Sequence, residues 1–192
     1  MRRVRQSLGI LLTRFRRVED GTAAVEFALV LPIMLMLYIG SVEVSLLISM
    51  DRKLQSVAGA LGDLVARSDG SISAGTLDDY FKAAAGIMTP HSTDELKQVV
   101  TQVKLTDTGI ATVVWSREYS GGDVSVGTKY LDGEEIENFP AAMKAVAGDN
   151  YVIIAEGSYA YPPLYGFAFK STVNLYRQNY FMPRFGERID IE

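Results

Sequence analysis

Residues 27–50 are the feature that most limits how this chain can fold. They read FALVLPIMLMLYIGSVEVSLLISM, 24 residues with a single charge at Glu43. As an α-helix this stretch would span about 36 Å, enough to cross the core of a bilayer. The uninterrupted apolar part is slightly short for a full span, so Glu43 must lie near the far interface, snorkel or face a partner. A buried core helix is the alternative, but such helices are rarely apolar on every side.

Charge is distributed unevenly along the chain. Residues 1–21 have a net charge of +4 from six arginines and two acidic residues, whereas residues 22–50 carry -2 and residues 51–192 carry -6. Arginines on the near side of an apolar span predict that the N-terminus is cytoplasmic. The acidic balance of residues 51–192 argues against nucleic-acid binding there, because phosphate contacts need a basic face.

The sequence predicts a processing site before the apolar run rather than after it. A secretory signal peptide would need a small-x-small site after the run, and the residues around Ser49 provide none. Gly21 instead closes the charged leader, and Glu26 follows five residues later, just inside the run. An ionisable group at that depth is costly and usually marks a function or a partner.

Residues 16–32, RRVEDGTAAVEFALVLP, resemble the processing site of type IV prepilins. In that family a membrane peptidase cuts after the glycine, which here would leave a chain that begins at Thr22, with Glu26 as its fifth residue. Thr22 and Glu26 would lie one helical turn apart on one face. The carboxylate of one subunit could then neutralise the new ammonium group of a neighbour. Either charge alone in lipid is penalised, so this pairing would set the register of assembly.

Within the pilin-like proteins, the sequence most closely resembles the TadE family, which belongs to the tight-adherence (Flp-type) pilus machinery. The similarity lies in GTAAVEFALVLP after the leader, in GSVE at residues 40–43, and in YFMPR at residues 180–184. Family tails more often read Met-Arg-Pro-Arg after an aromatic residue, whereas Met182 here runs directly into Pro183. The TadG branch shares a related N-terminal pattern but is usually longer, so the size of this chain favours TadE.

The TadE resemblance implies a minor pilin-like (pseudopilin) subunit that is needed for pilus assembly and is processed after Gly21. The implied partners are the prepilin peptidase, the major Flp-type pilin, sibling pseudopilins and the inner-membrane assembly platform. The implied location is the bacterial inner membrane, with a single span and a periplasmic C-terminal domain; incorporation into the pilus itself stays open. The alternative is an uncleaved, TadG-like envelope scaffold or sensor that binds partners through its outer domain.

Pro32 lies six residues beyond Glu26. A proline inside a helix removes one hydrogen bond, and neighbouring helices can tolerate this in a membrane. We expect a helix kink at Pro32, either an ordinary one or a flexible point used when the subunit leaves the bilayer.

The predicted fold is α+β and pilin-like: a long N-terminal transmembrane helix continues into an amphipathic stem that packs on an antiparallel sheet. The expected parts are a leader at 1–21, a transmembrane helix at 22–50, a helical stem at 51–67 and an extracytoplasmic domain at 68–192. One face of the stem carries its apolar residues: Leu54, Val57, Ala58, Leu61, Leu64 and Val65.

Local signals divide the outer domain further. Thr76 is expected to cap a second helix, and Thr89-Pro90 to end it. Alternating residues then predict strands over 99–105, 110–119, 151–161 and 167–180, with a hairpin turn at Gly121-Gly122. A short helix is expected over 140–146.

Few residues offer catalytic or metal chemistry. The chain has no cysteine, and His91 is its one histidine, which excludes thiol catalysis, disulfides and multi-histidine sites. The acidic run at 132–137 could bind calcium but lacks the spacing of a known loop, so a solvated loop is favoured. Nine aromatic residues between Tyr151 and Phe181 could form a stacking or sugar-binding surface, and we favour the core. We therefore expect no enzyme activity, no cofactor and no metal.

Overall fold

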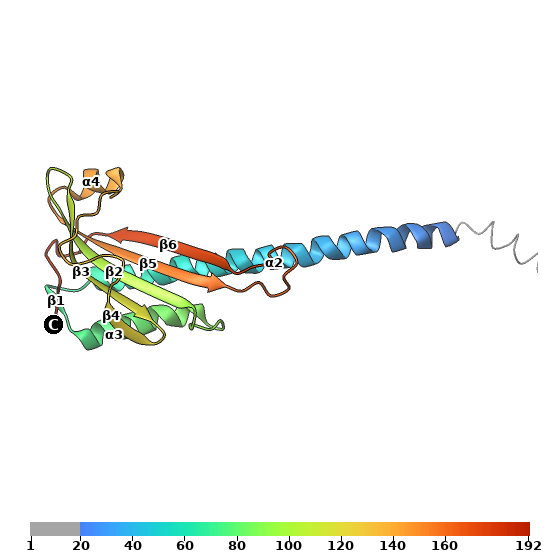
Figure 1. Ribbon diagram of the computed structural model, residues 1–192, viewed down its shortest axis with the longest axis horizontal. Coiled ribbons are helices and arrows are strands. Elements are labelled where there is room, and N and C mark those ends of the chain that lie inside the picture. Colours follow the sequence, from blue (N-terminus) through green and yellow to red (C-terminus); the bar gives the residue numbers. More distant parts are fainter. Residues whose placement is uncertain (1–19) are drawn as a thin grey trace, which may run out of the picture. The chain divides into compact units, whose positions relative to one another are not determined.

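The computed structural model describes residues 20–192 (Figure 1), so nearly all of the predicted leader lies outside the described residues. The chain divides into two compact units, one up to Val44 and one from Ser45 onwards. A single helix, α2 (Asp20–Ala66), contributes residues to both units. We call residues 20–44 the apolar half of α2, and residues 45–66 the stem.

The second unit is built around a five-stranded antiparallel sheet with the strand order β4-β3-β2-β5-β6 (Figure 1). The five strands are β2 (Leu96–Leu105), β3 (Ala111–Ser120), β4 (Asp123–Val126), β5 (Tyr151–Tyr161) and β6 (Val173–Phe181). The helices of this unit, besides the stem, are α3 (Ala74–Ala85), the short 3₁₀ helix η1 (Gly86–Met88) and α4 (Ala141–Ala147). The predicted α+β layout, with a long N-terminal apolar helix and an antiparallel sheet, is confirmed.

One face of the sheet packs on the stem and α3. The hydrophobic core there joins Leu54 and Leu61 of the stem to Phe81 of α3 and to the sheet residues Val100 and Ile153. The predicted apolar stripe of the stem is buried, apart from Leu64, which is partly exposed. Burying such a stripe against a sheet is the main source of stability for a short amphipathic segment.

Close packing of the stem depends on two glycines. A Cβ atom at Gly62 would lie 2.9 Å from the Cβ of Ala155, and one at Gly157 of β5 would lie 2.9 Å from Leu54 Cδ1. Both positions therefore need glycine, because any side chain there would keep the helix and the strand apart.

A smaller core lies on the sheet around Val103, Val113 and Ile154, where Phe139 and Ala147 of the segment containing α4 cover it. The Tyr180 ring packs edge-on against Phe139, with 5.6 Å between the ring centroids. The helix predicted at 140–146 is thus present, and its role is to cover this end of the sheet.

Several boundaries differ from the predictions. Ser73, not Thr76, caps α3, and its Oγ accepts a hydrogen bond from the backbone N–H of Thr76. The strand predicted over 167–180 is β6, which begins at Val173. Val173 pairs with Tyr161, the last residue of β5, so residues 167–172 have no partner in β5 and belong to the connection between the two strands.

The turns and the shortest strands show what local patterns can predict. The hairpin turn expected at Gly121-Gly122 joins β3 to β4, with φ angles of +61° and +97° that suit glycine. The parallel pair β1 (Ser71–Ile72) and β7 (Asp190–Ile191) was not predicted, because two-residue strands carry no periodicity.

Candidate functional site

The apolar half of α2 is a helix whose large apolar side chains lie open to the surroundings. Their exposed fractions between Val25 and Ile39 run from 36% at Ile39 to 69% at Leu29. Exposure on every side of a helix is unfavourable in water. Among the described residues, α2 is the helix that is long and apolar enough to cross a membrane.

The predicted processing residues lie in the first turns of this helix. Gly21, Thr22 and Glu26 are all exposed, and Thr22 and Glu26 are four residues apart, so they share one helix face. No described atom outside its own helical turn lies within 4 Å of where a Cβ at Gly21 would stand. Packing among the described residues therefore gives no reason for a glycine at this position. Inside a helix, glycine costs about 1 kcal/mol relative to alanine.

Pro32 lies inside α2, which continues on both sides of it. Because proline has no N–H, the carbonyl of Ala28 loses its intrahelical donor. The kink predicted at this position stays a prediction, as does its use as a flexible point.

Glu43 differs from the other predicted residues because its side chain is fully buried, with an exposed fraction of 0%. A buried carboxylate needs compensating hydrogen bonds or charges. The assignment of Glu43 as an intramembrane charge stays a prediction.

The segment that contains all of these residues matches a known family. Residues 21–60 match the model of that family, described as TadE-like protein. This segment is TadE-like. The resemblance predicted from the sequence is thereby confirmed, and the match begins at the glycine of the predicted processing site.

The TadE-like match supports a Tad pilus-associated protein, and the apolar helix α2 is compatible with a membrane anchor in a pilus system. Neither the search of curated proteins nor the search of solved structures gives a match to the chain.

Outside the TadE-like segment, two carboxylates form a polar row on the face of the sheet opposite the stem. Gly157 faces the stem, so its neighbour Glu156 points to the other face. Val99 of β2 pairs with Glu118 on one side and with Glu156 on the other. Both carboxylates are buried, with exposed fractions of 7% and 2%. Neither carboxylate was predicted from the sequence.

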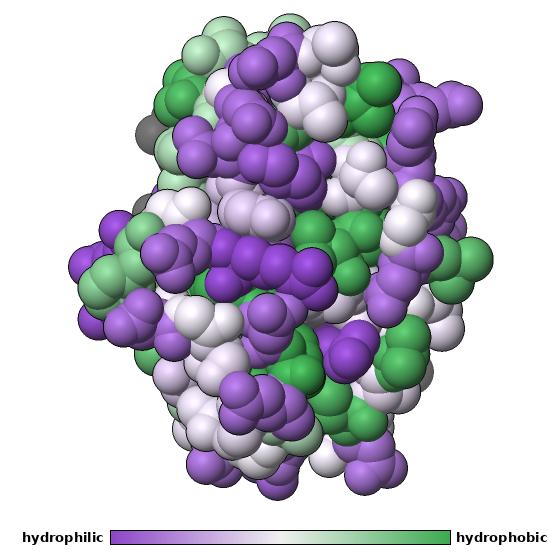
Figure 2. All heavy atoms as spheres, turned by 90° about the vertical axis from the view of Figure 1, so that its left-hand side faces the viewer, coloured by the Kyte–Doolittle hydropathy of each residue, from purple (hydrophilic) through white to green (hydrophobic). Residues whose placement is uncertain are grey.

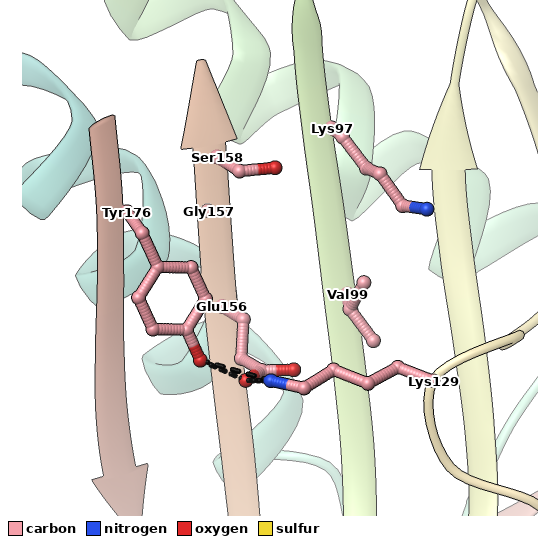
Figure 3. A pocket seen from close by; sticks show the side chains of 7 residues that line it. All are labelled: Lys97, Val99, Lys129, Glu156, Gly157, Ser158 and Tyr176. Atoms are coloured by element: carbon pink, nitrogen blue, oxygen red, sulfur yellow. Dashed lines mark hydrogen bonds and ion pairs between the residues drawn. The ribbon is translucent and has the colours of Figure 1, made fainter. Parts of the chain in front are cut away.

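Side chains from two segments, the loop after β4 and strand β6, hold the carboxylate of Glu156. Lys129 forms an ion pair with it, the Tyr176 hydroxyl donates a hydrogen bond to the same oxygen, and Gln178 Nε2 donates another at 3.2 Å. Figure 3 shows Tyr176 and Lys129 converging on the carboxylate from opposite sides, and all three residues line a pocket of about 300 Å³. The cluster ties β5 to β6 and to the loop after β4.

Contacts around the two carboxylates shift the pKa values of Lys129, Tyr176 and Glu118. Burial favours the neutral amine of Lys129, but the hydrogen bonds to Glu156 and Tyr176 outweigh it and raise the pKa of Lys129. Burial, together with the hydrogen bond to Glu156, raises the pKa of Tyr176 to about 12. Burial alone would raise the pKa of Glu118, yet hydrogen bonds from Lys97 and Thr128 lower it. At neutral pH Lys129 is therefore cationic and Tyr176 neutral, which suits a bracing role for this cluster.

The remaining candidates give a mixed outcome. The acidic run at 132–137 is exposed apart from Ile136, and no group of three or more acidic or histidine side chains among residues 20–192 could hold a metal ion. The core interpretation of the aromatic series is correct for Tyr159 and Tyr161, which are buried. It is wrong for Tyr165, Phe167 and Tyr176, which are 47–60% exposed.

Proposed function

We propose that this protein is a minor pilin-like subunit required for assembly of a tight-adherence (Flp-type) pilus, anchored by the apolar half of α2. The observation that carries the proposal is the TadE-like segment, in which a helix exposes large apolar side chains on every side. Water penalises that surface, so a bilayer or the apolar helices of neighbouring subunits must cover it.

The proposed location is the bacterial inner membrane, with one span. The leader carries six arginines and the region after the span is acidic. This asymmetry favours a cytoplasmic N-terminus and a periplasmic second unit.

The proposed maturation step is a cut after Gly21 by a prepilin peptidase. It would leave an ammonium group on Thr22, one turn from the exposed carboxylate of Glu26. In the assembled state, Glu26 of one subunit would neutralise Thr22 of the next, because both charges are costly in an apolar setting.

The proposed partners are the prepilin peptidase, the major Flp-type pilin, sibling pseudopilins and the inner-membrane assembly platform. The proposed role is structural rather than enzymatic. A chain without cysteine lacks the thiol that a cysteine nucleophile would supply.

The test is the N-terminal sequence and intact mass of the protein from native membranes, in cells with and without their prepilin peptidase. We expect a start at Thr22 only when the peptidase is present, and a chain that keeps its leader for Gly21→Leu. A chain that still begins at Met1 in cells with active peptidase would contradict processing and would favour the uncleaved, TadG-like scaffold.

A second measurement tests Glu26. We expect Glu26→Gln to be cleaved normally but to assemble few or no pili, because the Thr22 ammonium group would lack its partner. Ala24→Gln is the matched control, since it places the same amide two residues away while keeping the carboxylate. Equal loss of pili in both variants would show that polarity, not the charge pair, matters.

A further inference from the structure

The connection between β5 and β6 is an unusually apolar surface loop. Residues 162–172 read PPLYGFAFKST, and their only charge is Lys170. The side chains of Leu164, Tyr165 and Phe167 are 65%, 60% and 48% exposed. We call residues 162–172 the apolar loop. Elsewhere in the second unit, Val126 and Val146 are isolated along the sequence, and Met182 and Phe185 form a smaller exposed apolar pair.

Contacts along the stem show which end of the second unit carries this loop. Ala155 of β5 lies beside Gly62, whereas Gly157, two residues closer to the loop, lies beside Leu54. On β6, Arg177 forms an ion pair with Asp51. The strands thus approach the loop as the helix numbering decreases. The apolar loop therefore lies at the Ser45 end of the second unit, where the chain passes into the apolar half of α2 (Figure 1).

The other end of the second unit has a different surface. Figure 2 shows that end, which includes the C-terminus, and hydrophilic and hydrophobic side chains are mixed across it. At the Ser45 end, by contrast, the exposed apolar side chains Leu164, Tyr165 and Phe167 lie together in one loop.

We propose that the apolar loop inserts its side chains into the interfacial layer of the same bilayer that α2 spans. This inference rests on the proposed membrane anchor. Aromatic residues such as Tyr165 and Phe167 favour the headgroup level of a bilayer, where an apolar ring and nearby water are both accommodated. An irregular backbone can lie at that level but not in the hydrocarbon core.

The charge of the loop fits a lipid surface. No acidic residue occurs between Glu156 and Glu187. Lys170 is exposed, and its ammonium group can meet lipid phosphates while the neighbouring apolar side chains enter the headgroup region. The loop would thereby hold the second unit close to the membrane surface.

The absence of cysteine from the natural chain makes a direct test possible. Single-cysteine variants of the full chain, Phe167→Cys, Leu37→Cys and Val146→Cys, would carry an environment-sensitive fluorophore in vesicles of phosphatidylcholine and phosphatidylglycerol. Leu37 serves as the control within the span, and Val146, which is 70% exposed on α4, as the control in water. Lipids with a nitroxide at a shallow or a deep position would quench each probe.

We expect the Phe167 probe to be quenched several-fold more by the shallow nitroxide than by the deep one, at high and at low lipid-to-protein ratios. The Leu37 probe should prefer the deep nitroxide, and the Val146 probe should be quenched by neither. Leu164→Cys repeats the measurement at the most exposed position of the loop, in case Phe167→Cys disturbs it.

Three outcomes would overturn the proposal. A Phe167 probe that behaves like the Val146 probe, while Leu37 is quenched, would remove the loop insertion and leave the anchor intact. Quenching of neither Phe167 nor Leu37 would remove both. A change at Phe167 only at low lipid-to-protein ratio would assign the loop to contacts between subunits instead.

Discussion

The two parts of α2 share one helical backbone but bury their side chains differently. In the stem, apolar residues such as Leu54 and Leu61 are buried on one side, and polar residues such as Gln55 and Ser56 are exposed on the other. In the apolar half, residues such as Leu29 and Leu37 are 69% and 68% exposed, with apolar neighbours around the whole helix.

This difference shows that the stability of a helix depends on the surroundings that bury its apolar side chains as much as on helix propensity. A one-sided stripe can be buried by the protein's own sheet. A helix that is apolar on all sides needs a different solvent or a neighbouring helix. The two parts should therefore respond differently to the same substitution.

The largest expected difference is between Leu61→Ala and Leu37→Ala. Leu61 is fully buried, so its truncation should lower the free energy of unfolding of the second unit by about 2–5 kcal/mol. Leu37→Ala should change it by less than about 0.5 kcal/mol. Thermal unfolding followed by near-UV circular dichroism in mild detergent measures both. A similar loss in the two variants would mean that the two parts of α2 form one cooperative unit.

A charge in the apolar half should act on insertion instead of folding. Leu37→Lys should make membrane insertion less favourable by about 3 kcal/mol, because a lysine is costly near the centre of a span. The fraction of the protein that resists carbonate extraction from membranes measures this. Ser56→Lys, at an exposed position of the stem, is the control and should leave the fraction unchanged. Full retention of Leu37→Lys would argue against this part being the span.

The smallest effect concerns an ion cluster on the exposed side of the stem. Hydrogen bonds from Arg184, at 2.7 Å, and from Arg67 lower the pKa of Asp63. A lowered native pKa stabilises the fold above the unfolded-state pKa of about 4, and this contribution is lost as the pH falls through the native value. Asp63→Asn should therefore cost about 0.5 kcal/mol at pH 7, as an exposed pair does, and almost nothing near pH 2.

Thermal unfolding of the Asp63→Asn variant across that pH range checks the sign. Asp69→Asn, an identical change at an exposed aspartate just after α2, is the control and should have no effect at either pH. A deficit of Asp63→Asn that persists at pH 2 would assign it to packing instead of charge.

Much of the fold could be predicted because its signals are local. The stripe of the stem, the hairpin glycines after β3, and the limits of β5 at Tyr151 and Tyr161 all follow from short-range patterns. Gly21 and Glu26 could also be identified from the sequence, because both are recognised by their position relative to the apolar run. Their roles in processing and assembly stay predictions.

The buried carboxylates could not be predicted by the same means. Glu156 lies in an otherwise apolar strand, and the ion-pair partner Lys129 is 27 residues away. Its burial depends on β6 and on the loop after β4, which reach it only in the folded sheet. The sequence offers one signal, a charged residue inside the run YVIIAEGSYAY, but this signal does not identify the residues that contact Glu156.

The sequence by itself determined that one helix would change from all-round apolar to one-sided near its middle, because hydrophobic periodicity is a property of neighbouring residues. Only the tertiary structure decided the strand order β4-β3-β2-β5-β6, the alignment of Val99 between two carboxylates, and the position of the apolar loop at the Ser45 end of its unit. These features depend on contacts between residues far apart in the chain, where many pairings satisfy the same local pattern and packing selects one of them.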